Sequence, residues 1–193
     1  GVTVSTDEPG IVHKIDFESG QTVKEGDLLV QLEVSQELAQ LRSAEAQMRL
    51  AQANLARQEN LLKSRVSSQA DYDSVKAQYD QAVARIEEVK ALINKKTIRA
   101  PFGGVLGIRA VNLGQYLQSG AQVAPLQSLD PIYVNFWLPQ QNLGQIAAGQ
   151  AVRVRADGLP GMGFEGKINA VDSVIDEATR NVRVQATLAN PKA

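Results

Sequence analysis

The chain contains no cysteine and only one histidine, His13, among its 193 residues. The absence of cysteine excludes disulfide bonds, thiolate metal sites and cysteine nucleophiles. A single histidine on a strand-like segment with no second ligand nearby is not typical of a metal site. Aromatic residues make up 5% of the chain, whereas hydrophobic residues make up 44%. Much of the apolar content is therefore alanine, leucine and valine, which is typical of closely packed helices.

A strong net charge and long apolar runs are also absent. Lysine and arginine number 20 and aspartate and glutamate 21, so the formal net charge is −1. This balance gives no electrostatic reason to expect nucleic acid as a partner. No run approaches the roughly 18 apolar residues of a membrane-spanning helix, and no signal peptide is visible. The chain opens at GVTVST and stops at NPKA, and we expect it to be a piece of a longer protein.

Proline and glycine are missing throughout residues 34–96. Apolar residues recur there in a heptad-like 3-4 spacing, which predicts two antiparallel helices of about 28 residues, roughly 40 Å long. Ser64 to Ser68 interrupt the pattern, and Ser68 is a candidate N-cap of the second helix. The predicted seam between the helices consists of Leu41, Ala44, Met48, Ala51, Leu55, Gln58 and Leu62 in the first, and Tyr72, Val75, Tyr79, Ala82, Ile86, Val89 and Ile93 in the second.

An internal repeat flanks this helical segment. Residues 9–32 align with residues 103–126 at an offset of 94 without a gap. Each copy reads as short strands separated by glycine turns, and such strands cannot bury an apolar face alone. We therefore expect the two copies to pack face to face as a small β-sandwich of pseudo-symmetric halves. The candidate turn glycines are Gly10, Gly20, Gly26, Gly104, Gly114 and Gly120.

The last third of the chain predicts a different β domain. Segments DPIYVNFWLP, AVRVRADG, FEGKINAVDSVID and NVRVQATL read as strands, with a short helix over 140–148. Short strands at this spacing are typical of a small β-barrel, here incomplete. The predicted class is thus α+β, elongated and multi-domain. Its parts are the first sandwich half (1–33), the helical hairpin (34–96), the second sandwich half (97–129) and the barrel (130–193).

These segments resemble the periplasmic adaptors, or membrane fusion proteins of the HlyD-like family, that serve RND-type tripartite efflux pumps. The resemblance rests on both repeat copies, on TIRAPF from Thr97, and on LDPIYVNFWLPQQNLGQIAAGQAVRV. It implies a split lipoyl/biotinyl-like β-sandwich with an inserted coiled-coil hairpin and a partial β-barrel. Trp137 and the VRVRADG segment favour the RND branch. The membrane-proximal domain and the last barrel strand of the family are expected to lie outside this sequence.

One motif bears on partner binding. Family members that dock on TolC-like channels carry arginine, then leucine four residues on, then serine seven further on, at the hairpin tip. Arg57, Leu61 and Ser68 have this spacing. The resemblance therefore implies a docking role, in which arginine offers fork-like donors to carbonyls or carboxylates. An alternative from the residues alone stays open: Arg57 is a solvated residue, Leu61 is adjacent to the seam, and Ser68 is only a cap.

The resemblance implies an inner-membrane transporter and a TolC-like outer-membrane channel as partners, and self-association into a ring. It places the protein in the periplasm, anchored to the inner membrane through a segment outside this chain, with no cofactor and no enzymatic activity. One alternative is an adaptor of an ABC-type or type I secretion exporter. A lipoyl or biotinyl carrier is a remote alternative, because no Met-Lys-Met or Asp-Lys-Ala triplet occupies the joint, and Lys95 and Lys96 are expected to face solvent.

Overall fold

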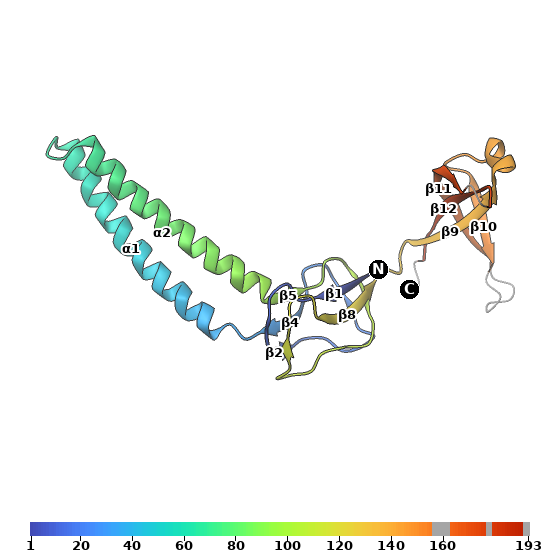
Figure 1. Ribbon diagram of the computed structural model, residues 1–193, viewed down its shortest axis with the longest axis horizontal. Coiled ribbons are helices and arrows are strands. Elements are labelled where there is room, and N and C mark those ends of the chain that lie inside the picture. The colour runs from blue at the N-terminus through green and yellow to red at the C-terminus, as the bar shows by residue number, and fades with distance from the viewer. Residues whose placement is uncertain (156–162, 177–178, 191–193) are drawn as a thin grey trace. The chain divides into compact units, whose positions relative to one another are not determined.

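The computed structural model describes residues 1–155, 163–176 and 179–190 (Figure 1). The chain divides into two compact units, Gly1–Leu126 and Gln127–Ala193. The division into four parts with the boundaries given above stays a prediction. Within the described residues, neither helix combines the length and the hydropathy needed to cross a membrane.

The first unit contains two four-stranded sheets, ordered β1-β8-β6-β3 and β5-β4-β2-β7. Each sheet takes strands from both copies of the repeat, so the copies exchange strands and do not form one sheet each. The pairing of β2 with β7 and that of β6 with β3 are equivalent under the 94-residue offset. The strands are β1 (Val2–Ser5), β2 (Gly10–Ile15), β3 (Thr22–Val23), β4 (Leu28–Leu32), β5 (Thr97–Arg99), β6 (Gly104–Leu106), β7 (Tyr116–Leu117) and β8 (Gln122–Gln127).

The core of this unit repeats the pseudo-symmetry. Five of the six apolar pairs matched by the repeat are buried, and burial of such side chains is the main force holding short strands together. The exception is Ile11 with Val105. Ile11 is 49% exposed because it neighbours the buried Val12, and successive residues of a strand point to opposite faces. The buried pairs are Val12/Leu106, Phe17/Val111, Val23/Leu117, Leu29/Val123 and Leu32/Leu126.

Four of the predicted turn glycines adopt left-handed backbone. Gly20, Gly26, Gly114 and Gly120 have φ between +78° and +84°, a conformation that residues with a Cβ rarely adopt. The prediction is wrong for the other two, Gly10 and Gly104, which stand at the first positions of β2 and β6. A Cβ on Gly10 would lie 3.3 Å from Leu32 Cδ1, so close packing is what this position requires.

The repeated glutamines stabilise the equivalent turns. The Gln21 side-chain oxygen accepts a hydrogen bond of 2.9 Å from the amide of Glu18. The Gln115 side-chain oxygen accepts one of the same length from the amide of Asn112. The identity of these two residues in the alignment therefore reflects one hydrogen-bond geometry used twice.

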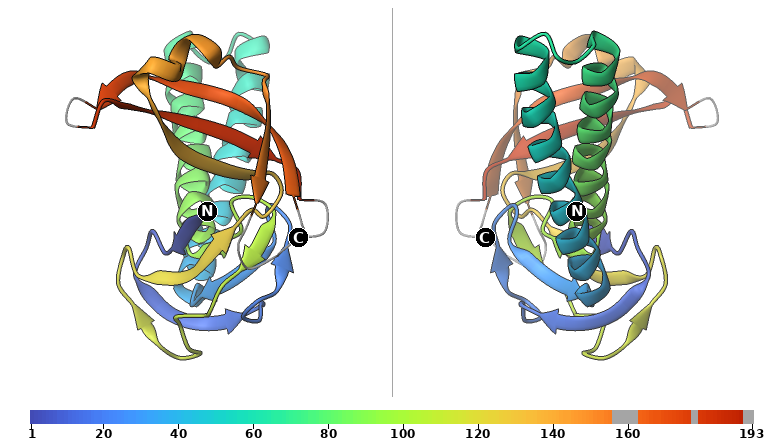
Figure 2. Two further views of the ribbon diagram at one scale, coloured as in Figure 1. Left: turned by 90° about the vertical axis from the view of Figure 1, so that its right-hand side faces the viewer. Right: turned by 90° about the vertical axis from the view of Figure 1, so that its left-hand side faces the viewer.

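The helices α1 (Ser35–Lys63) and α2 (Gln69–Lys95) lie side by side in both views of Figure 2. Every residue of the predicted seam is buried or half-buried, and Ala44, Ile86 and Val89 are the buried ones. Most charged residues of both helices are exposed, so each helix has the apolar stripe and polar outer face that are typical of paired helices. The coiled-coil character of the pair stays a prediction.

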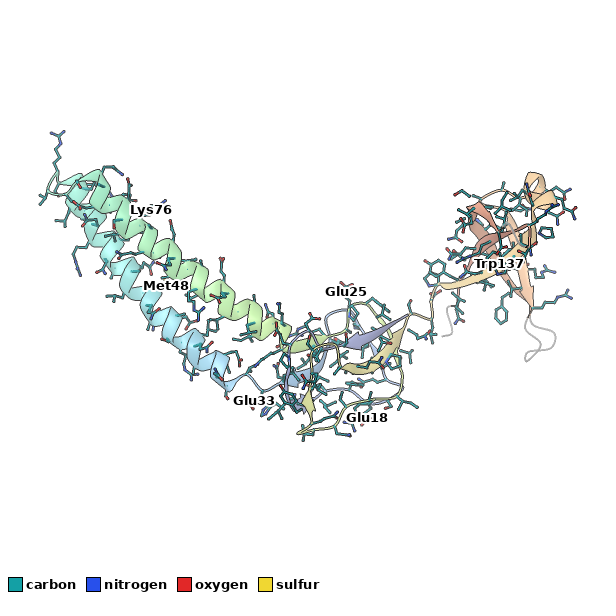
Figure 3. The ribbon with its side chains drawn as sticks, in the orientation of Figure 1. Glu18, Glu25, Glu33, Met48, Lys76 and Trp137 are labelled. Atoms are coloured by element: carbon teal, nitrogen blue, oxygen red, sulfur yellow. The ribbon has the colours of Figure 1, made fainter. Side chains whose placement is uncertain are left out.

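The second unit is a four-stranded antiparallel sheet ordered β10-β11-β12-β9. Its strands are β9 (Ile132–Pro139), β10 (Ala151–Arg155), β11 (Gly163–Asp176) and β12 (Asn181–Leu188), and a 3₁₀ helix η1 spans Gln140–Gln145. On β12, Val182, Val184 and Ala186 are fully buried. The end of the predicted strand AVRVRADG lies outside the described residues. Trp137 lies on β9 (Figure 3), 52% exposed, with the Arg183 guanidinium 5.2 Å from its ring centre.

Candidate partner-binding site at the hairpin tip

The tip of the hairpin is a short, hydrogen-bonded reversal between α1 and α2. The amide of Ser64 donates to the carbonyl of Asn60 at 3.0 Å, and the amides of Arg65 and Val66 donate to the carbonyls of Leu62 and Leu61, both at 2.9 Å. Arg65 has a φ of 57°, a left-handed conformation that lets the chain leave α1. These bonds satisfy carbonyls that the helix end leaves without an intrahelical partner.

Ser68 begins α2 with a complete capping box. Its hydroxyl accepts a hydrogen bond from the amide of Asp71 at 3.1 Å, while the Asp71 carboxylate accepts from the Ser68 amide at 3.3 Å. The Ser68 hydroxyl also donates to the same carboxylate at 2.6 Å. The bond from the Ser68 side chain, followed by that from its amide, lowers the pKa of Asp71. The prediction of an N-cap at Ser68 is confirmed.

Arg57 and Leu61 lie on one face of the last turns of α1, because residues four apart in a helix are neighbours. Arg57 is exposed and donates a long hydrogen bond of 3.5 Å to the Asn54 side chain. Leu61 is 37% exposed, high for a leucine. The structure thus brings Arg57 and Leu61 together, and both side chains are exposed. The hydroxyl of the third predicted residue, Ser68, already takes part in the cap of α2. Their docking role stays a prediction.

One further exposed residue of the tip lies outside the motif predicted from the sequence. Val66 is 73% exposed, which places an apolar β-branched side chain in solvent beside Leu61 of the same reversal. Within the segment SRVSS it is the one apolar residue between polar neighbours. An apolar residue among polar ones in a turn is the sequence signal for an exposed contact residue. We therefore include Val66 in the same candidate site.

The opposite end of the hairpin contains a second feature that the sequence did not reveal. Lys96 was expected to face solvent, but its side chain is only 16% exposed and its Nζ lies 2.5 Å from Glu37 Oε1, whose side chain is 9% exposed. The backbone of Lys96 explains the difference, since its carbonyl accepts hydrogen bonds from the Leu32 amide and the Gln31 side chain and so holds this residue against β4. Lys95 remains 57% exposed and pairs with Glu8.

Among the described residues, no three histidine, cysteine, aspartate or glutamate side chains come together in a way that could hold a metal ion. His13 is exposed on β2, with its Nδ1 3.3 Å from Glu33 Oε2. The amide of Ser35 donates to the other oxygen of Glu33 at 2.8 Å and is the main cause that lowers the pKa of this carboxylate. The side chains of His13 and Glu33 therefore contact each other and the first residue of α1.

Two substitutions of Ser68 test its role as the N-cap of α2. Ser68→Ala removes the side-chain cap and is expected to lower the stability of the hairpin by about 1 kcal/mol. Ser68→Asn retains a capping oxygen, so its cost is expected to be a few tenths of a kcal/mol. The measurement is the thermal unfolding midpoint by circular dichroism at 222 nm. Equal destabilisation by alanine and asparagine would contradict the capping role.

A pseudo-symmetric sandwich interrupted by a helical hairpin is the architecture of a barrel-sandwich hybrid domain, and in this chain an antiparallel β domain follows it. The family model of the CzcB-like barrel-sandwich hybrid domain matches residues 2–127, and that of the CusB-like beta-barrel domain matches residues 131–193. The chain belongs to the RND-type membrane fusion proteins.

Relatives and solved structures agree with this membership. An uncharacterised protein of Haemophilus influenzae is 37% identical over 187 residues, which cover 97% of this chain and 49% of that protein. The multidrug resistance protein MdtA of Proteus mirabilis is 29% identical over 96% of this chain and 50% of its own length. The chain spans about half the length of these relatives.

A solved MacA-MexA chimera that contains the α-hairpin domain of Pseudomonas aeruginosa MexA has the same fold. It matches 99% of this chain and 70% of its own length, with a TM-score of 0.82 and 23% identity. A putative efflux transporter from Bacteroides eggerthii matches 99% of this chain and 59% of its own length, with a TM-score of 0.81 and 22% identity. At these identities the likeness concerns the fold alone.

Proposed function

We propose that the protein is a periplasmic, non-catalytic adaptor that links an inner-membrane RND-type transporter to a TolC-like outer-membrane channel. In this proposal the hairpin is a two-stranded coiled coil, and its tip docks on the channel through Arg57, Leu61 and Ser68. The observation that carries the proposal is the tip itself. A hydrogen-bonded reversal presents a solvated guanidinium and exposed apolar side chains far along α1 from the sandwich.

Relatives support the transport role of the whole protein. MdtA of Proteus mirabilis and MdtE of Escherichia coli are named multidrug resistance proteins, and CzcB of Cupriavidus metallidurans is named a cobalt-zinc-cadmium resistance protein. These names differ in the compounds to which resistance is given. We therefore assign the adaptor role to this chain and leave the exported substrate to the transporter with which it assembles.

The contacts of the lysines where the hairpin joins the sandwich weigh against a carrier function. A lipoyl or biotinyl carrier needs an accessible lysine at the joint between the sandwich halves. Of the two lysines at that joint, Lys96 is held against Glu37, and the more exposed Lys95 belongs to the last turn of α2, not to an open turn, and pairs with Glu8 at 3.3 Å. An adaptor accounts for both contacts, because they fix the hairpin to the sandwich.

The experiment that tests the docking role compares two charge reversals on α1 in the full-length protein. Arg57→Asp is expected to weaken binding to a TolC-like channel by at least about tenfold, since reversing a paired interfacial charge costs a few kcal/mol. Arg42→Asp, at an exposed arginine of α1 about four turns nearer the sandwich, serves as the matched control and is expected to retain binding. Channel capture by the purified adaptor is the measurement. Retained binding by Arg57→Asp would remove this residue from the interface.

A further inference from the structure

One polar residue interrupts the apolar seam of the hairpin near its tip. Gln58 is half-buried on the seam of α1, whereas the other seam residues of this helix are apolar. A polar side chain at a seam position lowers the stability of paired helices and is retained where it fixes how they pair. The hydrogen-bond partner of Gln58 therefore indicates what it fixes.

That partner is Ser67, in the reversal that joins the two helices. The Gln58 side-chain amide donates a hydrogen bond to the Ser67 hydroxyl, which donates in turn to the Asp71 carboxylate at 3.4 Å. The same carboxylate oxygen accepts hydrogen bonds from the amide and the hydroxyl of Ser68, at 3.3 and 2.6 Å. A chain of side-chain hydrogen bonds thus runs from the seam of α1 to the capping box of α2.

Ser67 is the link between two separately anchored parts of the reversal. Residues 64–66 are held to the end of α1 by backbone hydrogen bonds, and Ser68 is held to α2 by its cap. In the described part of the chain, Ser67 forms hydrogen bonds only through its side chain. Gln58 is therefore the residue that ties this link to α1.

The side chains of the candidate docking site are neighbours of this bond. Arg57 precedes Gln58, and successive residues of an α-helix point about 100° apart, so a fixed Gln58 also fixes the direction of Arg57. Val66 precedes Ser67 and is 73% exposed. The bond therefore lies between the two parts of the site, the guanidinium on α1 and the apolar side chain on the reversal.

We propose that Gln58 is a positioning residue, which holds the reversal in the conformation that presents Arg57, Leu61 and Val66 together. This role rests on the docking function proposed for the tip, and it adds a residue that faces the seam and need not touch the channel. A tip ordered in advance binds more tightly, because no free energy of binding is spent on selecting a minor conformation. Gln58 thus lowers the stability of the seam and raises the order of the tip.

Substitution by leucine separates these two effects. Gln58→Leu restores an apolar seam, so the thermal unfolding midpoint of the full-length protein, followed by circular dichroism at 222 nm, is expected to stay the same or rise. This sequence contains no cysteine, so a spin label attached at Val66→Cys has no competing site in it. Gln58→Leu is expected to increase the mobility of that label. A label as immobile in Gln58→Leu as in its parent would overturn the proposal.

Two further variants show whether the hydrogen bond is the cause. Ser67→Ala is expected to mobilise the label as Gln58→Leu does, and the two substitutions combined are expected to add nothing, since both remove one interaction. Gln52→Leu, at an exposed glutamine of the same helix, is the matched control and is expected to leave the label and channel capture unchanged. Additive effects of Gln58→Leu and Ser67→Ala would contradict the pairing.

Capture of a TolC-like channel by the full-length protein is the functional readout. Gln58→Leu is expected to weaken capture about tenfold, the loss that follows when the ordered tip falls to about a tenth of the population. Weaker capture without a lower unfolding midpoint is a result that a merely structural role does not give. Unchanged capture, or a loss that follows a lower midpoint, would remove the positioning role. If the unchanged protein captures no channel, the docking proposal fails, whereas the spin label still decides whether Gln58 orders the tip.

Discussion

Replacing Leu32 by alanine is expected to lower the free energy of unfolding of the sandwich by about 2–5 kcal/mol, the usual cost of truncating a buried leucine. Leu32 is fully buried at the end of β4 and pairs across the sheet with Val12 of β2. Helix α1 begins three residues later, at Ser35. The lost side chain would therefore leave a cavity where the sandwich meets the hairpin.

The matched control for this substitution is Leu50→Ala. Leu50 lies on α1 and is 65% exposed, so its loss removes little buried surface, and alanine is the best helix former. We expect a change within about 0.5 kcal/mol. Chemical denaturation followed by circular dichroism measures both variants. An equal loss of stability in Leu32→Ala and Leu50→Ala would contradict the placement of Leu32 in the core.

Lys96→Met is expected to destabilise the hairpin root by about 3 kcal/mol, since it leaves the carboxylate of Glu37 largely buried without its cation. The Lys96 ammonium is also near the Glu33 carbonyl, at 3.4 Å. Both helix ends are thus tied to the sandwich at this point. Hydrogen exchange at the amides of the first turns of α1 is the most local measurement, and we expect faster exchange there than in the unchanged protein.

Two comparisons show whether the ion pair is the cause. Glu37→Met combined with Lys96→Met is expected to recover most of the loss, because a well-packed apolar pair often replaces a buried ion pair without cost. Lys76→Met removes an exposed pair on the same hairpin and is expected to change stability by less than about 0.5 kcal/mol. A double variant as unstable as Lys96→Met alone would argue that the lysine acts through its packing and not through its charge.

The repeat at an offset of 94 predicted most of the sandwich because each strand and turn has its own local signal. Gly20 and Gly114 mark left-handed turns, and Leu29 and Val123 mark the same core position in each copy. The exchange of strands between the copies was not predictable, since alternation of apolar residues does not say with which strand a strand pairs. Glycine is common in turns, so Gly10 gives a turn signal, whereas close contact with Leu32 is the physical reason for a glycine at this position.

The hairpin, too, was predictable from the sequence only in part. Heptad spacing predicted which residues face the other helix, because a helix has one fixed period. The pair of Glu37 and Lys96 joins residues far apart in the sequence and has no periodic signal. At the tip, the cap at Ser68 follows from local chemistry alone, whereas whether Arg57 and Leu61 bind a partner depends on a surface that this chain does not contain.

The central claim is that the hairpin tip, and not the hairpin root, meets the outer-membrane channel. The direct measurement places a photo-crosslinking amino acid at Val66, 73% exposed at the tip, or at Leu38, 41% exposed near the start of α1, in the full-length protein in cells that contain a TolC-like channel. The account predicts a crosslinked product with the channel from position 66 and none from position 38. A channel product from position 38, or none from position 66 in cells with active efflux, would contradict it.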